Sequence, residues 1–580
     1  MPRKFLDEEK IANLLEELPS DYDEDTDEEV DHTTPSSTVQ TIDMLLDDSA
    51  TVTLVEDIES GETSEAYVID IMSEPAGTSN VTSRNPSSNG ECQRKWMKKP
   101  EPAVDVSFSP RPIGFVDFSS PLDAFLELFN EDIIEKVLYE SNLKSVQNHK
   151  PAAITKDELK VFLGINIMMG YHCLPSIAHY WASARDLEVL PIKNAMSRER
   201  FQIILRNLHV NDNSKMDPRN KDKLYKIRPL LQHLNAVFAD KRPLKEYLCI
   251  DESMILFKGR SSLKQYNPMK PIKRGYKLWC LADDDGYVYK TDVYTGKKED
   301  AGRRSELGLG GDVVTSLLSN VKEPNHKVTF DNFFSSIPLL EDLQTKKILA
   351  CGTIRANRKG LPKLIEDKKM KRGDFDYRST PYGISVYKWM DSKPVHFISN
   401  YHGDTLTTVE RKKYDGSRVT VQCPDVVKDY NEHMGGVDKH DAARQCYGSD
   451  RKSTKWWHRL FFGLLDMALV NAHILYNEEM ANENISMFDF VRNVALGLMT
   501  YSKRDERGLL KRRKSNYSTP TSVRLSNVGV HLVEFTNNKN RCEVCSKGGV
   551  QSRVITRCSH CGVHLCCNSS RNCFNTYHTA

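Results

Sequence analysis

Three short segments decide the class of this chain: EYLCIDESMILF at residues 246–257, GYKLWCLA at 275–282 and YVYKTDVY at 287–294. They are rich in β-branched and aromatic residues and have a hydrophobic period of two, which is typical of strands. The polar turn DDDG at 283–286 separates the last two segments, as a hairpin requires. The segments therefore predict a meander of three strands.

Helices and strands alternate after this meander. The patterns predict helices at 312–320 and 337–345 and short strands at 327–330 and 351–355. We therefore expect an α/β unit at residues 244–355.

Helical periodicity dominates on both sides of this unit. Ser120 and Pro121 form an N-cap and first turn, and Thr155 to Glu158 form a capping box. The chain is therefore predicted to have a multidomain α/β fold. Its expected parts are a disordered acidic region at 1–112, a helical unit at 118–243, the α/β unit at 244–355, a β-rich insertion at 356–425, a return to the α/β unit at 426–450, a second helical segment at 451–502, a basic linker at 503–540 and a Cys-rich end at 541–580.

The charge is distributed unevenly along the 580 residues. The net charge is only +1, but residues 1–63 hold 20 acidic and three basic side chains, a balance of −17 that leaves +18 for the rest of the chain. A basic body with an acidic arm favours a protein that binds a polyanion such as nucleic acid. The alternative is that both are ordinary solvated surfaces.

Neither a membrane span nor a secretory signal is expected. The mean hydropathy is −0.53, and the apolar stretch at 460–476 is interrupted by Asp466, Asn471 and His473. Acidic residues follow Met1 closely, where a signal sequence would be basic and then apolar. Half of the 14 cysteines are scattered singly, which indicates reduced thiols inside the cell.

Three aspartates stand where carboxylates are unusual. Asp251 lies within an apolar strand, Asp331 follows the strand VTF, and Asp438 ends the motif MGGVD, with Asp441 one helical turn later. Converging carboxylates repel one another unless a cation lies between them, and hard oxygen ligands favour Mg²⁺ or Mn²⁺. Such a site could cut phosphodiesters. The alternative is that these residues only cap turns and helices.

The other seven cysteines lie between Cys542 and Cys573. Two CxxC pairs predict zinc ligands, and two tetrahedral zinc ions in a cross-brace are expected. Disulfides are the alternative. The expected ligands are Cys542, Cys545, Cys558, Cys561, Cys566, Cys567, Cys573 and His578, with His560 and His564 as spares and the choice among His564, Cys566 and Cys567 left open.

Basic and aromatic side chains gather at two places. Cations bind phosphates, and an aromatic ring can stack on an exposed base. Trp456 could equally belong to the core face of the helix that follows it. The tetrapeptide KRRK at 511–514 predicts nuclear localisation. The candidates for DNA binding are Lys270, Lys273, Arg274 and Lys277 beside the second strand, and Arg451, Lys452, Lys455 and Trp456 before the apolar helix.

A series of motifs runs in order from residue 118 to the C-terminus. They are RERF at 198–201, LHVND at 208–212, CIDES at 249–253, KPIKRGYK at 270–277, TFDNFF at 329–334, GTIR at 352–355, MGGVD at 434–438 and KW at 455–456. Together they resemble the motifs of the piggyBac family of DNA transposases. The acidic arm carries no such resemblance.

This resemblance implies an RNase H-like catalytic core. Its catalytic acids would be Asp251, Asp331 and Asp438, with Asp441 as a further acidic residue beside them. The resemblance also implies that Trp456 stacks against DNA, that the basic end of GTIR, Arg355, contacts DNA, and that the Cys-rich end binds transposon-end DNA. The helical segments would form a dimerisation and DNA-binding domain around the core.

The implied activity is cut-and-paste transposition. Metal-assisted hydrolysis would free a 3′-hydroxyl at each terminal inverted repeat, and that hydroxyl would attack target DNA at TTAA. The implied partners are double-stranded DNA and further copies of the chain, in a homodimer or larger assembly. Two alternatives remain: a domesticated, transposase-derived protein that binds DNA or chromatin without mobilising it, and a zinc-bearing interaction module on an inert scaffold.

Overall fold

The computed structural model describes residues 94–98, 105–110, 118–268, 270–296, 305–412, 417–449, 453, 455–480, 484–501 and 531–579. The chain divides into two units, residues 1–89 and 90–580, and the first lies wholly outside the described residues. Most of the predicted acidic region and residues 503–530 of the predicted basic linker also lie outside them, together with Arg451, Lys452 and the KRRK tetrapeptide.

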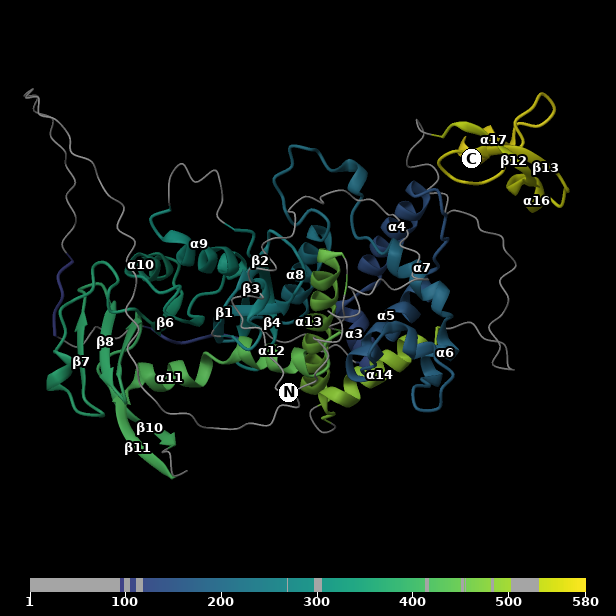
Figure 1. Ribbon diagram of the computed structural model, residues 1–580. Coiled ribbons are helices and arrows are strands. Elements are labelled where there is room, and N and C mark those ends of the chain that lie inside the picture. Colours follow the sequence, from purple (N-terminus) through teal and green to yellow (C-terminus); the bar gives the residue numbers. More distant parts are fainter. Residues whose placement is uncertain are drawn as a thin grey trace, which may run out of the picture. The chain divides into compact units, whose positions relative to one another are not determined.

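The predicted meander is confirmed and lies toward one end of a nine-stranded sheet (Figure 1). Strand β1 pairs antiparallel with β3, and β3 pairs antiparallel with β4. The two short strands predicted after the meander, β5 and β6, lie parallel to β1 on its other side. The bounds are β1 (Tyr247–Leu256), β3 (Arg274–Asp283), β4 (Val288–Val293), β5 (Lys327–Phe330) and β6 (Leu349–Thr353), with the unpredicted β2 (Lys264–Tyr266) beside β3.

The segment predicted as a β-rich insertion continues this sheet. Strand β9 (Pro394–Ser399) pairs antiparallel with β6, and β8 (Ser385–Met390) and β7 (Phe375–Ser379) extend the sheet outward. Without β9, strand β6 would be an edge strand with unpaired backbone hydrogen-bonding groups. Strand β9 pairs with those groups. Only β10 (Leu406–Lys412) and β11 (Arg418–Pro424) form a separate two-stranded ribbon. Strands β7, β8 and β9 of this segment therefore belong to the main sheet and do not form a separate module.

Helices that precede and follow the sheet in sequence pack on one another (Figure 1). The Ser120 N-cap and the Thr155 capping box are both present, as predicted. Close packing of α5 on α14 depends on Gly164, where a Cβ would lie 2.8 Å from the Ala495 carbonyl oxygen. The bounds are α3 (Pro121–Leu128), α4 (Glu131–Gln147), α5 (Lys156–Tyr171), α6 (Leu190–Ala195), α7 (Arg198–Asn207), α8 (Arg228–Lys241), α13 (Trp456–Glu479) and α14 (Met487–Met499).

Helix α13 is the one helix in the described part of the chain that is long and apolar enough to cross a membrane. Its most apolar window is 78% buried inside the structure, and it packs against α3, α8, α12 and α14. Since a helix that is apolar all round needs burial, α13 acts here as a core helix.

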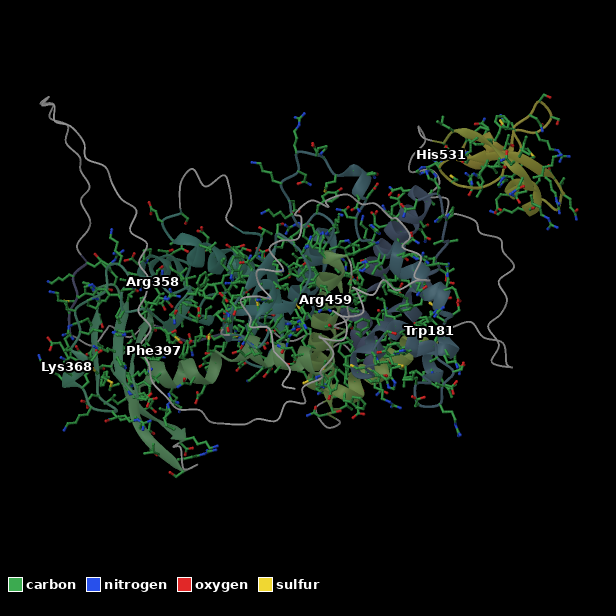
Figure 2. All side chains as sticks on the ribbon, in the orientation of Figure 1. Trp181, Arg358, Lys368, Phe397, Arg459 and His531 are labelled. Atoms are coloured by element: carbon green, nitrogen blue, oxygen red, sulfur yellow. The ribbon has the colours of Figure 1, made fainter. Side chains whose placement is uncertain are left out.

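Four helices belong to the sheet region: α9 (Gly308–Leu317), α10 (Ile337–Thr345), α11 (Asp425–His433) and α12 (Gly436–Cys446). Figure 2 places Phe397 in the sheet region and Trp181 in the helical region, where the indole Nε1 donates to the Met196 carbonyl oxygen at 2.8 Å. The short 3₁₀ helices of the described chain are η1 (Ile177–Trp181), η2 (Asn213–Lys215), η3 (Leu318–Asn320) and η4 (Asp367–Lys369).

Two predictions at the ends of the chain need correction. Residues 94–98 and 105–110 were expected to be disordered, but Met97 forms a bridge with Ser379 and Arg94 donates to Glu341 at 2.7 Å. The backbone of Ser379 on the edge strand β7 and the Glu341 carboxylate are therefore partners for residues 94–98. The composition of this polar segment does not reveal such partners. At the other end, the described C-terminal segment starts at His531, inside the predicted linker. Its elements are β12 (Val533–Arg541), α16 (Glu543–Lys547), β13 (Arg553–Cys558) and α17 (Cys573–Thr579).

Candidate catalytic site and metal centres

Asp251 and Asp331 lie at neighbouring positions of two parallel strands, Asp251 within β1 and Asp331 directly after β5. The register of the parallel pair β1–β5 ends with Ile250 opposite Phe330, so the next residue of each strand is one of these aspartates. Asp251 is still inside β1, where it pairs with Cys280 of β3, whereas Asp331 comes directly after the last residue of β5. The sheet therefore brings together two carboxylates that are 80 positions apart in the sequence.

A lysine joins Asp251 to Asp438. The Lys270 Nζ lies 3.2 Å from Asp251 Oδ2 and also 3.2 Å from Asp438 Oδ1. The Asp251 side chain is 13% exposed, whereas that of Asp438 is 68% exposed. One ammonium therefore lies between a buried and an open carboxylate. The sequence analysis assigned Lys270 only to phosphate binding.

Burial and mutual repulsion act on these acids. Burial raises the pKa of Asp251 to about 6; Lys270 opposes that rise, and Asp438 and Asp331 add to it. Burial also raises the pKa of Asp331, against a hydrogen bond that its Oδ1 accepts from the Phe333 backbone at 2.9 Å. The negative charges of Asp438 and Asp331 therefore act on Asp251, which a cation between them would offset.

Helix α12 sets the position of Asp438. It packs on β1 and β3, and a Cβ on Gly436 would lie 1.9 Å from the Asp283 carbonyl oxygen and 2.7 Å from the Cys249 Sγ. Only glycine allows the backbone to approach the sheet so closely. Asp438 follows two residues later, in the first turn of α12.

Asp441 has a different environment from Asp438. Its Oδ1 accepts a hydrogen bond from Ser253 Oγ at 2.6 Å and from Arg444 at 3.2 Å, and the residue is buried. Its carboxylate therefore has two partners inside the fold. These contacts support a positioning role between α12 and β1.

The three predicted catalytic carboxylates are not packed like a closed metal cage. Among the described residues, the sets of three or more ligand atoms within 4.8 Å of one another do not include Asp251, Asp331 and Asp438.

Glu252, which was not predicted from the sequence as a site residue, pairs with Lys277 and accepts a hydrogen bond from Asn267 at 3.3 Å. A carboxylate next to Asp251 on the same strand is therefore already neutralised.

The predicted DNA-binding side chains have varied surroundings. Lys273 and Arg274 are exposed, and the Arg274 guanidinium lies 5.5 Å from the centre of the exposed Tyr266 ring. Lys277 is instead held by Glu252 and lies over the Phe333 ring at 4.8 Å, because it faces the acidic edge of β1. It is therefore less open to phosphate than predicted.

Two of the remaining candidates contact the chain itself. Arg355 is exposed and donates to Asn332 Oδ1 at 2.9 Å, while Arg358, labelled in Figure 2, donates to the Asn332 and Phe333 carbonyl oxygens. These arginines brace the loop after Asp331. Lys455 donates to the Arg206 carbonyl oxygen at 2.6 Å, and Trp456 is partly buried against the core.

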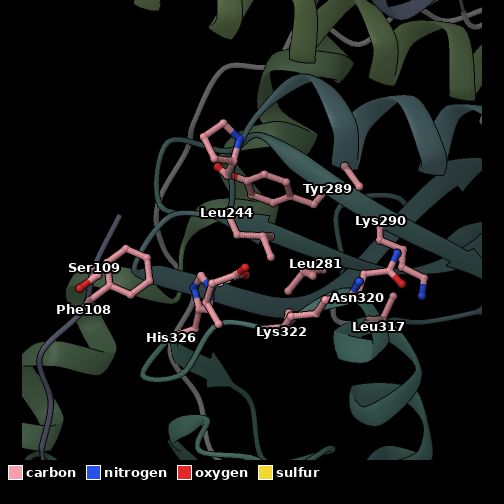
Figure 3. A pocket seen from close by; sticks show the side chains of 14 residues that line it. Phe108, Ser109, Leu244, Leu281, Tyr289, Lys290, Leu317, Asn320, Lys322 and His326 are labelled. Carbon is pink, nitrogen blue, oxygen red and sulfur yellow. Dashed lines mark hydrogen bonds and ion pairs between the residues drawn. The ribbon is translucent and has the colours of Figure 1, made fainter. Parts of the chain in front are cut away.

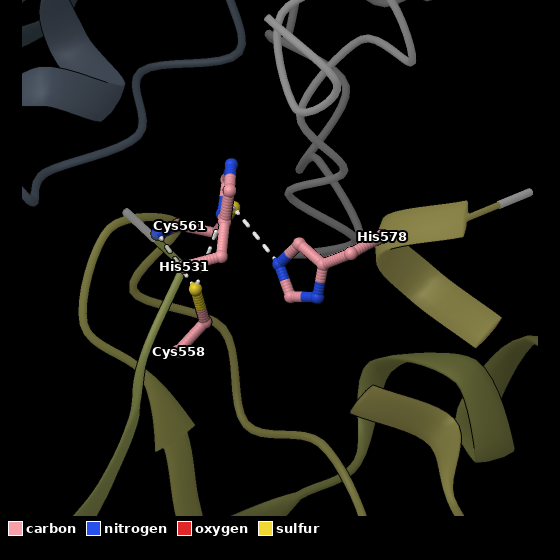
Figure 4. Close-up of side chains that lie close together, drawn as sticks. All are labelled: His531, Cys558, Cys561 and His578. Carbon is pink, nitrogen blue, oxygen red and sulfur yellow. Dashed lines mark hydrogen bonds between the residues drawn. The ribbon is translucent and has the colours of Figure 1, made fainter. Parts of the chain in front are cut away.

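The C-terminal residues form two clusters of potential metal ligands. In the first, shown in Figure 4, His531, Cys558, Cys561 and His578 converge. His531 Nδ1 lies 3.4 Å from Cys558 Sγ and 3.2 Å from Cys561 Sγ. His578 Nδ1 lies 2.8 Å from the Phe574 carbonyl oxygen, which can only accept, and Nε2 lies 3.4 Å from Cys561 Sγ, so Nε2 is the ring nitrogen that is placed to bind a metal.

The charge state of this cluster suits a metal. Interaction with Cys561 lowers the pKa of the Cys558 thiol to about 3 against the effect of burial, and His578 and His531 contribute to that decrease. The thiolate is the form that binds zinc. Two sulfurs and two imidazole nitrogens make a donor set that zinc prefers.

The second cluster consists of Cys542, Cys545, Cys566 and Cys573. Cys545 Sγ lies 3.7 Å from Cys566 Sγ and 3.6 Å from Cys573 Sγ. Such separations rule out a bonded disulfide, and these cysteines are free. The CxxC pairs alternate between the two clusters, which is the cross-brace order that the sequence predicted.

Two ligand assignments differ from the prediction. Cys567 is exposed and lies outside both clusters, while its neighbour Cys566 is buried in one, because successive side chains of an extended segment point to opposite sides. His531 takes the eighth place. A lone histidine ahead of a strand has no characteristic spacing, so sequence reasoning missed it. His564 instead contacts Thr536 Oγ1 at 3.1 Å, and the clusters do not include His560.

A cavity of about 240 Å³ lies elsewhere in the structure (Figure 3). Its lining includes Phe108, Leu244, Leu281, Tyr289 and His326, and none of the predicted catalytic residues. A mostly apolar cavity without converging reactive groups fits packing beneath the segment 105–110 better than catalysis.

Comparison with known proteins agrees with this geometry. The family described as Transposase IS4 matches residues 120–473. PiggyBac transposable element-derived protein 3 of Homo sapiens is 30% identical over 565 residues, which cover 94% of this chain and 91% of the relative. PiggyBac transposable element-derived protein 2 of Homo sapiens is 30% identical over 470 residues, covering 79% and 76%.

A solved structure shares the fold. It is described as a piggyBac transposase synaptic complex with hairpin DNA, and it matches with a TM-score of 0.58 at 21% identity over 78% of this chain and 95% of the solved chain. The family match spans more than half of the chain. The chain therefore belongs to the Transposase IS4 family and, within it, to the piggyBac transposases and the proteins derived from them.

Proposed function

We propose that the chain is a metal-dependent DNA transposase that cuts phosphodiester bonds and transfers the freed 3′-hydroxyl to TTAA target sites. The observation that carries this proposal is the adjacency of Asp251, within β1, and Asp331, directly after β5, with Asp438 linked to Asp251 through Lys270. Family membership makes this reaction class the natural one.

The core is proposed to be RNase H-like. Support comes from the strand order β4-β3-β1-β5-β6, in which an antiparallel meander is continued by two strands parallel to β1. The acids lie on the central strand, at the end of its parallel neighbour and on a helix that packs on the sheet. This arrangement places all three on elements rather than on long loops, which favours accurate positioning.

The donor set fits Mg²⁺ or Mn²⁺. Carboxylate oxygens are the ligands that these hard cations prefer. Asp438 and Asp331 raise the pKa of Asp251, and a positive charge between them opposes that increase. The Lys270 ammonium already supplies one such charge between Asp251 and Asp438. Asp251, Asp331 and Asp438 would hold the metal, which supplies Lewis-acid stabilisation of the phosphate oxygens.

The protein's own groups do the rest. The carboxylates would hold the phosphate only through the cation that they share, because carboxylate and phosphate are both anionic, and α12 keeps Asp438 open to solvent. Lys270 can move from the carboxylates to a DNA phosphate, since its long side chain is flexible and its charge is compact. Lys273 and Arg274 are exposed beside it and would bind the DNA backbone.

The two C-terminal clusters are proposed to bind one zinc ion each and to present the hairpin β12–β13 to transposon-end DNA. The hairpin exposes Phe535, which is 75% accessible, beside the basic residues Lys539, Arg541 and Arg553. Aromatic and basic side chains together suit nucleic acid. The chain is further proposed to act in the nucleus as a homodimer or larger assembly, because both transposon ends must be brought together.

A second candidate is a DNA-binding protein derived from a transposase that no longer cuts. The human relatives are named as transposable element-derived proteins, which favours considering it. In that case the zinc clusters and the exposed cations would carry the function. The carboxylates would then be retained without catalysing a reaction.

A cleavage assay separates these candidates. The substrate is a plasmid carrying the inverted repeats that flank the gene, incubated with the full chain and Mg²⁺. We expect cutting by the wild type and a loss on the order of 10³-fold or more in Asp251→Asn, Asp331→Asn and Asp438→Asn. Asp312→Asn, an exposed acid on α9, is the matched control. DNA binding without any cutting by the wild type would favour the second candidate.

A further inference from the structure

Three potential metal ligands of different chemistry meet away from the catalytic acids and the C-terminal clusters. Cys351 lies on β6, His402 follows β9, and Asp429 lies on α11. One ligand atom from each lies within 4.8 Å of the other two. No part of the proposed reaction uses them.

The fold holds these residues on three packed elements. Cys351 is paired with Ser399 in the β6–β9 register, so His402, three positions after Ser399, returns to the same place. Helix α11 packs on β6 and β9 and brings Asp429 to them. Ligands that come from rigid elements are held in position before an ion arrives.

The distances suit a tetrahedral ion. His402 Nε2 lies 3.3 Å from Asp429 Oδ2. Ligand atoms about 2.0–2.3 Å from a zinc ion at tetrahedral angles lie roughly 3.3–3.8 Å apart. A thiolate, an imidazole and a carboxylate are all zinc ligands, and three of them leave a fourth position for water.

Neighbouring groups orient the ligands in the way that metal sites require. His402 Nδ1 lies 2.9 Å from Ser399 Oγ, and a proton on Nδ1 donated to that oxygen leaves Nε2 free for the ion. The Tyr401 hydroxyl donates to Asp429 Oδ2 and lies 3.6 Å from Cys351 Sγ. Cys351 is fully buried, whereas Asp429 is 19% exposed, so an ion can enter from the side of the carboxylate.

From this geometry we propose that Cys351, His402 and Asp429 bind a zinc ion, as a third metal centre of the chain. Its effect would be structural. It would tie the neighbouring strands β6 and β9 to α11, and α11 leads directly into α12 and Asp438. Without an ion, the same groups would be a hydrogen-bond network centred on Tyr401. The proposal does not depend on whether the chain cuts DNA.

Counting zinc in the intact chain tests this proposal. The full chain is reconstituted with Zn²⁺, freed of loosely bound metal, and measured by elemental analysis. We expect three zinc ions per chain in the wild type and two in Cys351→Ser. Cys423→Ser, which alters another buried cysteine of the same core cluster, should keep three.

A second variant guards against misfolding. His402→Gln changes a side chain that is 10% exposed, and it should also bind two zinc ions while showing the circular dichroism spectrum of the wild type. Cys558→Ser, in a C-terminal cluster, should lose one ion independently, so that the double variant with Cys351→Ser binds one. Two zinc ions in the wild type, or an unchanged count in folded Cys351→Ser and His402→Gln, would overturn the proposal.

Discussion

The C-terminal clusters and the catalytic acids are assembled in opposite ways. Each C-terminal cluster brings four ligand atoms within 4.8 Å of one another. The acids at the sheet edge come from distant parts of the chain, and a lysine ammonium lies between two of them. Thiols and imidazoles can gather while neutral, but ionised carboxylates repel. The difference is therefore one of charge: thiols and imidazoles can converge through packing, whereas converging carboxylates need a positive charge, which Lys270 supplies between Asp251 and Asp438.

Removing zinc should have the largest effect, and chiefly on the C-terminal region. Structural zinc contributes about 10–16 kcal/mol of binding free energy in small domains, and this region has little apolar core beyond its ligands. Treatment with a strong chelator should expose residues 531–579 to protease while the sheet region stays folded. Limited proteolysis followed by mass spectrometry measures the difference.

Cysteine variants sharpen this test. Cys558→Ser should lose one zinc ion and reproduce the protease sensitivity, and Cys567→Ser, the exposed neighbour of the second cluster, should behave as the wild type. Equal effects of the two substitutions would mean that the clusters seen here do not hold the metal.

The sequence predicted most elements of this fold, because their patterns are local. Strands β1, β3 and β4, helices α10 and α13 and the capped start of α5 all carry clear periodicity or capping residues. The placement of β9 beside β6 was not predictable, since pairing between distant strands leaves no local pattern. For the same reason the predicted insertion became part of the main sheet.

The sites follow the same rule. Sequence reasoning named seven of the eight clustered ligands, four of them through CxxC spacing, because a zinc knuckle is a local structure. It failed at Cys567, where only the direction of the side chain separates a ligand from its neighbour, and at His531, which has no spacing signal. Lys270 was seen as a surface cation, and only the fold shows that it lies between Asp251 and Asp438.

Substitution of Gly436 should have the next largest effect, now on the side of the catalytic acids. Gly436→Ala forces a Cβ to within 1.9 Å of the Asp283 carbonyl oxygen, so α12 must move away from the sheet. We expect a loss of about 2–4 kcal/mol in the free energy of unfolding. Urea denaturation followed by circular dichroism measures it.

The neighbouring glycine is the control. A Cβ on Gly435 meets nothing within 4 Å, so Gly435→Ala should cost no more than about 1 kcal/mol, which is the range for an N-cap change. If both substitutions had the same cost, close packing of α12 on the sheet would not be what positions Asp438.

Substitution of Lys270 should have the smallest effect. Lys270→Gln removes the charge that competes with a metal for Asp251 and Asp438, so Mg²⁺ should bind about tenfold more tightly, or roughly 1.4 kcal/mol. Lys273→Gln, an exposed lysine of the same loop, should leave the affinity unchanged. Calorimetric titration of the zinc-loaded chain with Mg²⁺ measures both. Weaker binding in Lys270→Gln would show that the ammonium assists the metal instead of substituting for it.

Manganese binding to the zinc-loaded chain tests the central claim most directly, since Mn²⁺ reports on the carboxylates without any need for DNA. Electron paramagnetic resonance titration should show that Asp251→Asn, Asp331→Asn and Asp438→Asn each weaken Mn²⁺ binding by on the order of 30-fold or more, while Asp312→Asn binds as the wild type does. Equal Mn²⁺ affinity in the wild type and all three variants would contradict a metal site shared by these carboxylates.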